Sequence, residues 1–388
     1  MNANAIVRVC WLCVLLAGAS ISAQQIQTLD LREEGYAASK PMSNVLQRHA
    51  SSQILSISNN GDVAVGFVTK DKSGLATREP PPLSFHIVSF TKVGQFLFQS
   101  TIPTSSWYEN SLFYGQDRRL LVHAGPKLLL FSETMQRLVD KDLLTTQDSM
   151  LLNWRIYPLR NRTAFLLYTY RRLDTSIELI RWDNLQTIKR CRFDPSDRVL
   201  DVSDDMALLF HSTNPKDPLR RVAEATDICG HSRFVYSWRG DTVNAVLIRG
   251  GLLLAGGGSS ITFVMDGHVQ WTDSFDKKTD LVNQSVKSSA DGRFAVIAVS
   301  HFGGGSRFRD LPRKLAGIKV LMYDVTTGKK LIEIPIAGTQ FVDFDFALSP
   351  AGDVLAVTCE GILQLITLTE SRANRSAGPR VGFIPADL

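Results

Sequence analysis

The chain is built from short apolar runs separated by polar turns. Three units share a turn of the form Ser-x-x-Gly followed by small and β-branched apolar residues, at residues 56–67, 288–299 and 346–368. In each unit one apolar run precedes the turn and another follows it, which is the pattern of a β-hairpin. The runs are continuous or alternating and lack the i, i+3, i+4 spacing of an amphipathic helix. The pattern predicts an all-β protein.

The hairpin recurs along the chain. Weaker copies lie at residues 112–125, 156–169, 200–212 and 246–258. The turn centres fall near residues 61, 117, 161, 205, 250, 292 and 352, at spacings of about 42 to 60 residues. A period in the forties with several strands per unit is typical of a β-propeller. We therefore expect a seven-bladed β-propeller of four-stranded blades.

The third and fourth strands of several units can also be recognised. They are clearest at residues 176–193, 260–275 and 317–336, where Asp266-Gly267 and Thr327-Gly328 provide tight turns. With Trp182-Asp183 closing one third strand and Tyr323-Asp324 preceding Gly328, the chain resembles the seven-bladed WD-repeat and YVTN-type propellers, including the quinoprotein amine dehydrogenase β-chain-like group. The resemblance covers roughly residues 26–368 and implies an architecture without a function.

The two ends of the repeat region complement each other. After the third strand of the last unit, residues 369–388 read as a basic tail rather than an outer strand. Residues 25–31 alternate apolar with polar and precede the first unit. We expect them to supply the missing fourth strand, which closes the ring and removes a sheet edge. The predicted propeller domain spans residues 24–368.

The N-terminus differs from the rest of the chain. Arg8 is its only charge, and an apolar run of about eleven residues, too short to span a bilayer, is followed by small residues. This is the pattern of a cleavable signal peptide over residues 1–23, with Ala19 as an alternative cleavage site to Ala23. A buried N-terminal helix is the competing interpretation. The prediction is a secreted or periplasmic protein with no membrane span in its mature chain.

Removal of the signal leaves three cysteines. An odd number in an oxidising compartment suggests one disulfide and one free thiol, and Cys191 with Cys229 is the candidate pair because Cys359 lies far away in sequence. Three buried, unpaired thiols are the alternative.

Irregular length is concentrated in the loops that join second to third strands, at residues 69–83, 169–175, 212–220 and 300–317. These loops share one face of a propeller, and long loops on a rigid scaffold commonly carry function. They are also basic, and we select Arg171, Arg172, Arg307, Arg309 and Lys314 as binding candidates for a protein or an anionic ligand. An ordinary solvated rim is the alternative.

A second candidate site is the central channel. The innermost strands carry polar residues near their starts, and oxygen atoms converging on the axis suit a hard cation such as calcium. The candidates are Asn153, Asp201, Asn244, Asn283 and Asp343, together with Gln53 and Asn110. A water-filled polar tunnel is the alternative interpretation.

The sequence contains no recognisable motif for a metal site or for a serine nucleophile. The histidines show no HxH or HExxH spacing, and no G-x-S-x-G sequence occurs. The net charge of +5 is too mild to indicate nucleic-acid binding. We expect no cofactor and no metal. The sequence favours a non-enzymatic binding or scaffold module that recognises its partner through the long loops. The alternative is a channel-centred enzyme, similar to a lactonase or a quinoprotein dehydrogenase, or a non-catalytic subunit of one.

Overall fold

The computed structural model describes residues 22–36, 54–70, 83–105, 109–143, 153–170, 175–193, 198–203, 206–211, 220–227, 231–239, 244–303, 315–336, 338 and 343–369. These residues are almost entirely β-strand, and the one helix among them is the short 3-10 helix η1 (Leu31–Glu34). Within these ranges no helix has the length and apolar character needed to cross a membrane.

The described strands form seven four-stranded antiparallel sheets, numbered here in the order of their first strands. Sheet 1 holds β2 (Leu55–Ile57), β3 (Val63–Lys70), β4 (Leu83–Phe90) and β5 (Phe96–Thr104). Sheet 2 holds β6 (Asn110–Tyr114), β7 (Leu120–Ala124), β8 (Lys127–Phe131) and β9 (Arg137–Asp142). Sheet 3 holds β10 (Asn153–Pro158), β11 (Ala164–Tyr170), β12 (Thr175–Arg181) and β13 (Thr187–Phe193).

Sheets 4 to 6 repeat this strand order. Sheet 4 holds β14 (Arg198–Val202), β15 (Met206–His211), β16 (Arg220–Asp227) and β17 (Ser232–Arg239). Sheet 5 holds β18 (Asn244–Ile248), β19 (Gly251–Ala255), β20 (Ser260–Met265) and β21 (His268–Ser274). Sheet 6 holds β22 (Asp280–Ser288), β23 (Phe294–Phe302), β24 (Leu315–Asp324) and β25 (Lys330–Ile336).

Sheet 7 combines the two ends of the repeat region. Its order is β1 (Ser22–Asp30), β28 (Ile362–Thr369), β27 (Val354–Cys359) and β26 (Asp345–Leu348). β1 pairs antiparallel with β28, with Ile26 opposite Ile366 and Leu29 opposite Leu363. The N-terminal segment thus takes the outer-strand position that the sequence assigns to it.

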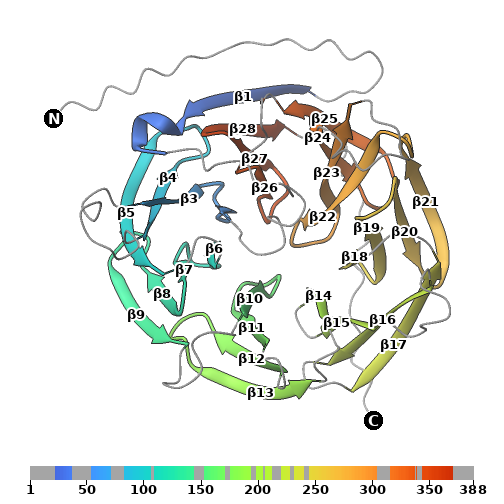
Figure 1. Ribbon diagram of the computed structural model, residues 1–388, viewed down its shortest axis with the longest axis horizontal. Coiled ribbons are helices and arrows are strands. Elements are labelled where there is room, and N and C mark those ends of the chain that lie inside the picture. Colours follow the sequence, from blue (N-terminus) through green and yellow to red (C-terminus); the bar gives the residue numbers. More distant parts are fainter. Residues whose placement is uncertain are drawn as a thin grey trace.

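The sheets are arranged around a central axis, with first strands such as β6, β10 and β14 toward the centre and fourth strands such as β9 and β13 at the periphery (Figure 1). Burial follows this order. All five residues of β6 are buried, whereas β9 alternates between exposed and half-buried positions and β5 is mostly exposed or half-buried, with Ile102 as its one buried residue. A strand that is buried on both faces of its sheet is expected to be apolar throughout, whereas a strand with one exposed face alternates between apolar and polar residues.

The repeated Ser-x-x-Gly turn has a specific hydrogen-bond pattern. In the turn between β26 and β27, Ser349 Oγ accepts the N–H groups of Asp353 (3.0 Å) and Val354 (2.9 Å). Gly352 takes a positive φ of 74°, and a Cβ there would lie 2.4 Å from the Phe294 ring of sheet 6. The turns of Ser58 and Ser289 are built similarly, with backbone N–H groups on the serine oxygen. The motif recurs because it ends the inner strand and permits close packing of the next sheet.

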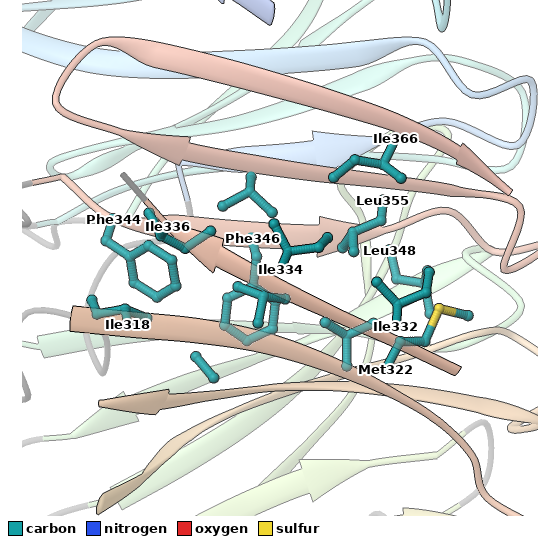
Figure 2. Close-up of a cluster of buried hydrophobic side chains, with 14 of the residues drawn as sticks. Ile318, Met322, Ile332, Ile334, Ile336, Phe344, Phe346, Leu348, Leu355 and Ile366 are labelled. Carbon is teal, nitrogen blue, oxygen red and sulfur yellow. The ribbon is translucent and has the colours of Figure 1, made fainter. Parts of the chain in front are cut away.

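Neighbouring sheets pack face to face through apolar side chains. Figure 2 shows the cluster between sheets 6 and 7, where Ile318, Met322 and Ile334 meet Phe346 and Leu355. Ile26 of β1 packs against this cluster, and Leu29 packs against the cluster between sheets 7 and 1. The core is therefore a series of interfaces between sheets.

Candidate functional site

The long-loop face is defined as the end of the sheets from which the loops 69–83, 169–175, 212–220 and 300–317 project. Strand pairing fixes the origin of each loop. The last pairs before the loops are Lys70 with Leu83, Tyr170 with Thr175, His211 with Val222, and Phe302 with Leu315. In each case the chain leaves the end of a second strand and returns at the start of a third, as expected.

The binding candidates on this face fall outside the described residues. They are Arg171, Arg172, Arg307, Arg309 and Lys314. At the base of the loop after Phe302, the Nδ1 atom of His301 lies 2.7 Å from a carboxylate oxygen of Asp280. In sheet 1, the His86 ring lies between the hydroxyls of Thr69 (2.7 Å) and Thr101 (3.0 Å). The candidate arginines therefore remain a prediction, while the strands that carry them are well packed.

Polar side chains of the inner strands connect one sheet to the next. The Asp345 carboxylate on β26 accepts the N–H groups of Ile54 and Leu55 at the start of β2, each at 3.0 Å. Ser56 Oγ on β2 accepts the N–H of Tyr114 on β6 at 2.9 Å. These side chains thus hydrogen-bond to backbone donors at the inner strand of the neighbouring sheet.

Asp201 does the same for sheets 4 and 5, because its carboxylate accepts the N–H of Leu247 at 2.8 Å. It is the fourth residue of the five-residue strand β14, and a register irregularity separates it from Val199. The expectation that Asp201 lies near the start of its strand is wrong, because the strand continues to the turn. Asp201 consequently lies at the end of the inner strand that is remote from the long loops.

Three of the remaining channel candidates take part in hydrogen bonds with other side chains. Asn283 is buried and accepts a hydrogen bond from Ser300 of the adjacent strand at 3.0 Å, and Asn110 accepts one from Thr104 at 2.9 Å. Asp343 precedes β26 and accepts the Tyr36 hydroxyl at 2.6 Å, next to the chain segment that follows β1. Asn153 and Asn244 open their strands, and the side chain of Asn153 and all of Gln53 lie outside the described residues.

No group of three or more His, Cys, Asp or Glu residues in the described ranges is arranged to hold a metal ion. The oxygens of Asp201 and Asp345 that face the inner strands are engaged by backbone N–H groups. The polar channel residues stay a candidate site only.

A cavity of about 170 Å³ lies at the turn end of the inner strands. We call it the turn-face cavity. Its wall is formed by the C-terminal ends of β2, β10, β14, β22 and β26 and the turns after them. Because the first turns and the long loops lie at opposite ends of the second strands, the cavity opens on the face opposite the long-loop face.

Three of the four charged side chains that line the turn-face cavity are cationic: Arg160, Arg162 and Lys287, against Asp201. Arg162 Nη1 donates to the carbonyl oxygens of Ile57 (2.7 Å) and Tyr114 (3.1 Å), so the turn of sheet 3 reaches sheets 1 and 2. Arg160 Nη2 lies 3.7 Å from an Asp201 oxygen. It is buried and has no hydrogen-bond acceptor among the described residues.

Burial dominates the titration of these groups. It lowers the pKa of Arg162 to about 10 and lowers the pKa of Lys287, an effect that the charge of Asp345 opposes. Burial raises the pKa of Asp201, against the opposing influence of Arg160 and of the Leu247 N–H. Desolvation disfavours a charged form, so each of these shifts indicates a site poorly screened by water.

Sequence reasoning missed Arg160, Arg162 and Lys287. Arg160 and Arg162 belong to a turn recognised only as a hairpin connection, and Lys287 is the penultimate residue of β22. The available signal was the position itself, because the last residues of a propeller's first strands surround the axis. Basic residues there are unusual in segments that are otherwise apolar.

The cysteines fit a partial disulfide framework. Cys191 on β13 is disulfide-bonded, and Cys359 at the end of β27 is free and buried. Cys229 lies outside the described residues, so its pairing with Cys191 stays a prediction.

Comparison with known proteins identifies the fold. No protein-family model matches the chain, and no curated protein matches its sequence. Among solved structures, a chain from the "Crystal Structure of Mitotic Checkpoint Complex" is 14% identical with a TM-score of 0.52, covering 94% of this chain and 100% of its own. The C-terminal WD40 domain of Sif2 is 10% identical with a TM-score of 0.45, covering 82% of this chain and 97% of its own. The chain therefore has a β-propeller fold with four-stranded antiparallel blades.

Proposed function

We propose that the protein is an extracytoplasmic binding or scaffold module that recognises a protein or an anionic ligand through the long-loop face. The observation that carries the proposal is the common origin of the four loops. Each begins where a second strand ends and finishes where a third strand begins, at the same end of sheets 1, 3, 4 and 6. A rigid set of sheets that presents several long loops on one side is suited to recognition.

The architecture belongs to the same proposal. We take the seven sheets as the seven blades of one closed ring, with β1 as the outer strand that joins the chain's N-terminal segment to the last blade. The β1–β28 pairing and the hydrogen bonds from Ile54 and Leu55 to Asp345 support this closure. The relation to the quinoprotein amine dehydrogenase β-chain-like group is likewise part of the proposal.

Charge explains the choice of ligand. Arginine side chains present fork-shaped donors that fit carboxylate and phosphate groups, and the loop sequences contain more basic than acidic residues. Arg307 and Arg309 lie in the longest of these loops, residues 300–317. This loop also contains three consecutive glycines.

The test is charge reversal in the full-length chain. Partners are crosslinked in the extracytoplasmic fraction and recovered with the wild type, with the R307E/R309E double variant, and with R181E as a control. Arg181 is an exposed cation at the end of β12, away from these loops. We expect R307E/R309E alone to lose the recovered partners. An unchanged set of partners would overturn the binding role of this face.

The compartment has its own test. N-terminal sequencing of the exported protein should show Gln24 as the first residue, or Ser20 if cleavage follows Ala19. Retention of Met1 in an exported or cell-associated chain would contradict the signal-peptide assignment.

A further inference from the structure

We propose that the turn-face cavity binds a small oxyanion of the phosphate or sulfate class. This site is separate from the proposed partner surface, because the cavity lies at the opposite end of the same strands. The described residues that line it lie at the ends of first strands or in the turns that follow them.

The cavity is large enough for a small oxyanion. It has a volume of about 170 Å³ and is open to solvent, so a tetrahedral oxyanion fits together with surrounding waters. The lining residues come from the ends of five first strands and from the turns after three of them.

The charged residues that line the cavity favour an anionic ligand. The charged residues that line the cavity are Arg160, Arg162, Lys287 and Asp201. Asp345 lies near Lys287 without lining the cavity. Even with both carboxylates counted as ionised, cations outnumber anions among these five groups. In a partly buried site such an excess attracts an anion more strongly than on an exposed surface.

Arg160 places a charged donor at the wall of this cavity. Its Nη2 atom is buried without a hydrogen-bond acceptor among the described residues, and a carboxylate oxygen of Asp201 is 3.7 Å away. Leaving a buried donor unpaired is costly, whereas rotation of the guanidinium toward the cavity lets an oxyanion accept a charge-assisted hydrogen bond from it. Arg162 is held in place by its bonds to Ile57 and Tyr114, so its guanidinium is already oriented.

The experiment is a calorimetric titration of the full chain with sodium phosphate at constant ionic strength, set with sodium chloride. We expect saturable binding at one site, competed by sulfate. The variants R160M and K287M should each weaken it at least tenfold, whereas R181Q, which removes a cation on the outer part of sheet 3, should leave it unchanged. Absence of saturable binding, or equal binding by all the variants, would overturn the proposal.

Asp201→Asn gives a test that structural damage cannot imitate. The amide oxygen can still accept the Leu247 N–H, while the negative charge is lost. We expect phosphate to bind several-fold more tightly to D201N than to the wild type. Unchanged or weaker binding by a folded D201N would contradict the electrostatic argument. Competition by glycerol phosphate then distinguishes an esterified ligand from the free ion; both results support a phosphate-class site.

Discussion

His123 shows how burial alone can set the behaviour of a single residue. It is the fourth residue of β7 and almost fully buried, with its ring edge-to-face against Trp154 at a centroid distance of 6.3 Å. Its Nε2 atom has no hydrogen-bond partner among the described residues. Burial lowers its pKa to about 4, although a backbone hydrogen bond with Gly125 opposes the shift. The folded protein thus holds a neutral imidazole.

We predict that His123 makes the protein sensitive to acid. The unfolded chain protonates this imidazole near pH 6.5 and the folded chain only near pH 4, so the unfolded state binds more protons between these values. The free energy of unfolding should therefore fall as the pH drops through this window, by on the order of 3 kcal/mol in total.

Urea denaturation at several pH values measures this effect. His123→Phe should flatten the dependence between pH 6.5 and 4, and His268→Gln, at an exposed position on β21, should leave it as in the wild type. An equally steep loss of stability in H123F would show that other groups are responsible.

Arg162 is a single residue that connects three sheets by hydrogen bonds. Its Nη1 atom bonds carbonyl oxygens of two other sheets, and hydrogen bonds to charged groups contribute more than neutral ones. We predict that Arg162→Gln lowers the free energy of unfolding by about 3 kcal/mol. Arg155→Gln, at a half-buried position on β10, is the matched control and should cost far less. The two variants are compared by urea denaturation at pH 7, and equal stabilities would refute the bracing role.

At the scale of the element, the turn between first and second strands is the repeated device. A serine hydroxyl gathers backbone N–H groups, and a glycine at positive φ brings the turn against the neighbouring sheet. The serine thereby ends one strand and starts the next, and the glycine allows the two sheets to approach closely.

We predict that Ser349→Ala lowers the free energy of unfolding by about 2 kcal/mol, because one buried and one partly buried N–H group lose their acceptor. Ser132→Ala is the control. Its hydroxyl accepts the N–H groups of Thr134 and Gln136 in an outer turn, where water can replace it. Thermal or urea unfolding should separate the two variants, and an equal cost would show that burial of the turn does not matter.

These elements also show what the sequence can predict. The strands and their turns follow from apolar runs and Ser-x-x-Gly spacing, because both are local properties. The direction of a side chain near the channel does not follow so directly, since one irregularity reverses the alternation. β14 has a register irregularity next to Asp201, and β22 has one between Val282 and Val286 just before Lys287. The turn-face cavity combines five distant segments, so no local pattern announces it.

At the scale of the whole molecule, stability depends on interfaces between sheets rather than on one central core. Ile26 and Leu29 of β1 pack against the two clusters that flank sheet 7. β1 also covers the edge of β28, whose backbone groups would otherwise be open to pairing with another chain.

We predict that Ile26→Asp lowers the free energy of unfolding by roughly 3 kcal/mol, because it places a charge against an apolar cluster. Thr28→Asp, at an exposed position of the same strand, is the control and should change it little. A chain lacking residues 22–30 should melt at lower temperature and associate through the uncovered edge, as measured by light scattering. A truncated chain that melts as the intact protein does would refute the proposed closure.

The pairing of β1 with β28 has a consequence for the order of folding. β1 is the first of the described strands to be synthesised, and β28 is the last, so their residues are separated by more than 300 positions. Contacts at such separation form slowly, because a long segment must be ordered before they are made. Sheets 1 to 6 can form while synthesis proceeds, whereas sheet 7 must wait for the end of the chain. The first of the described strands to be made is thus the one that completes sheet 7.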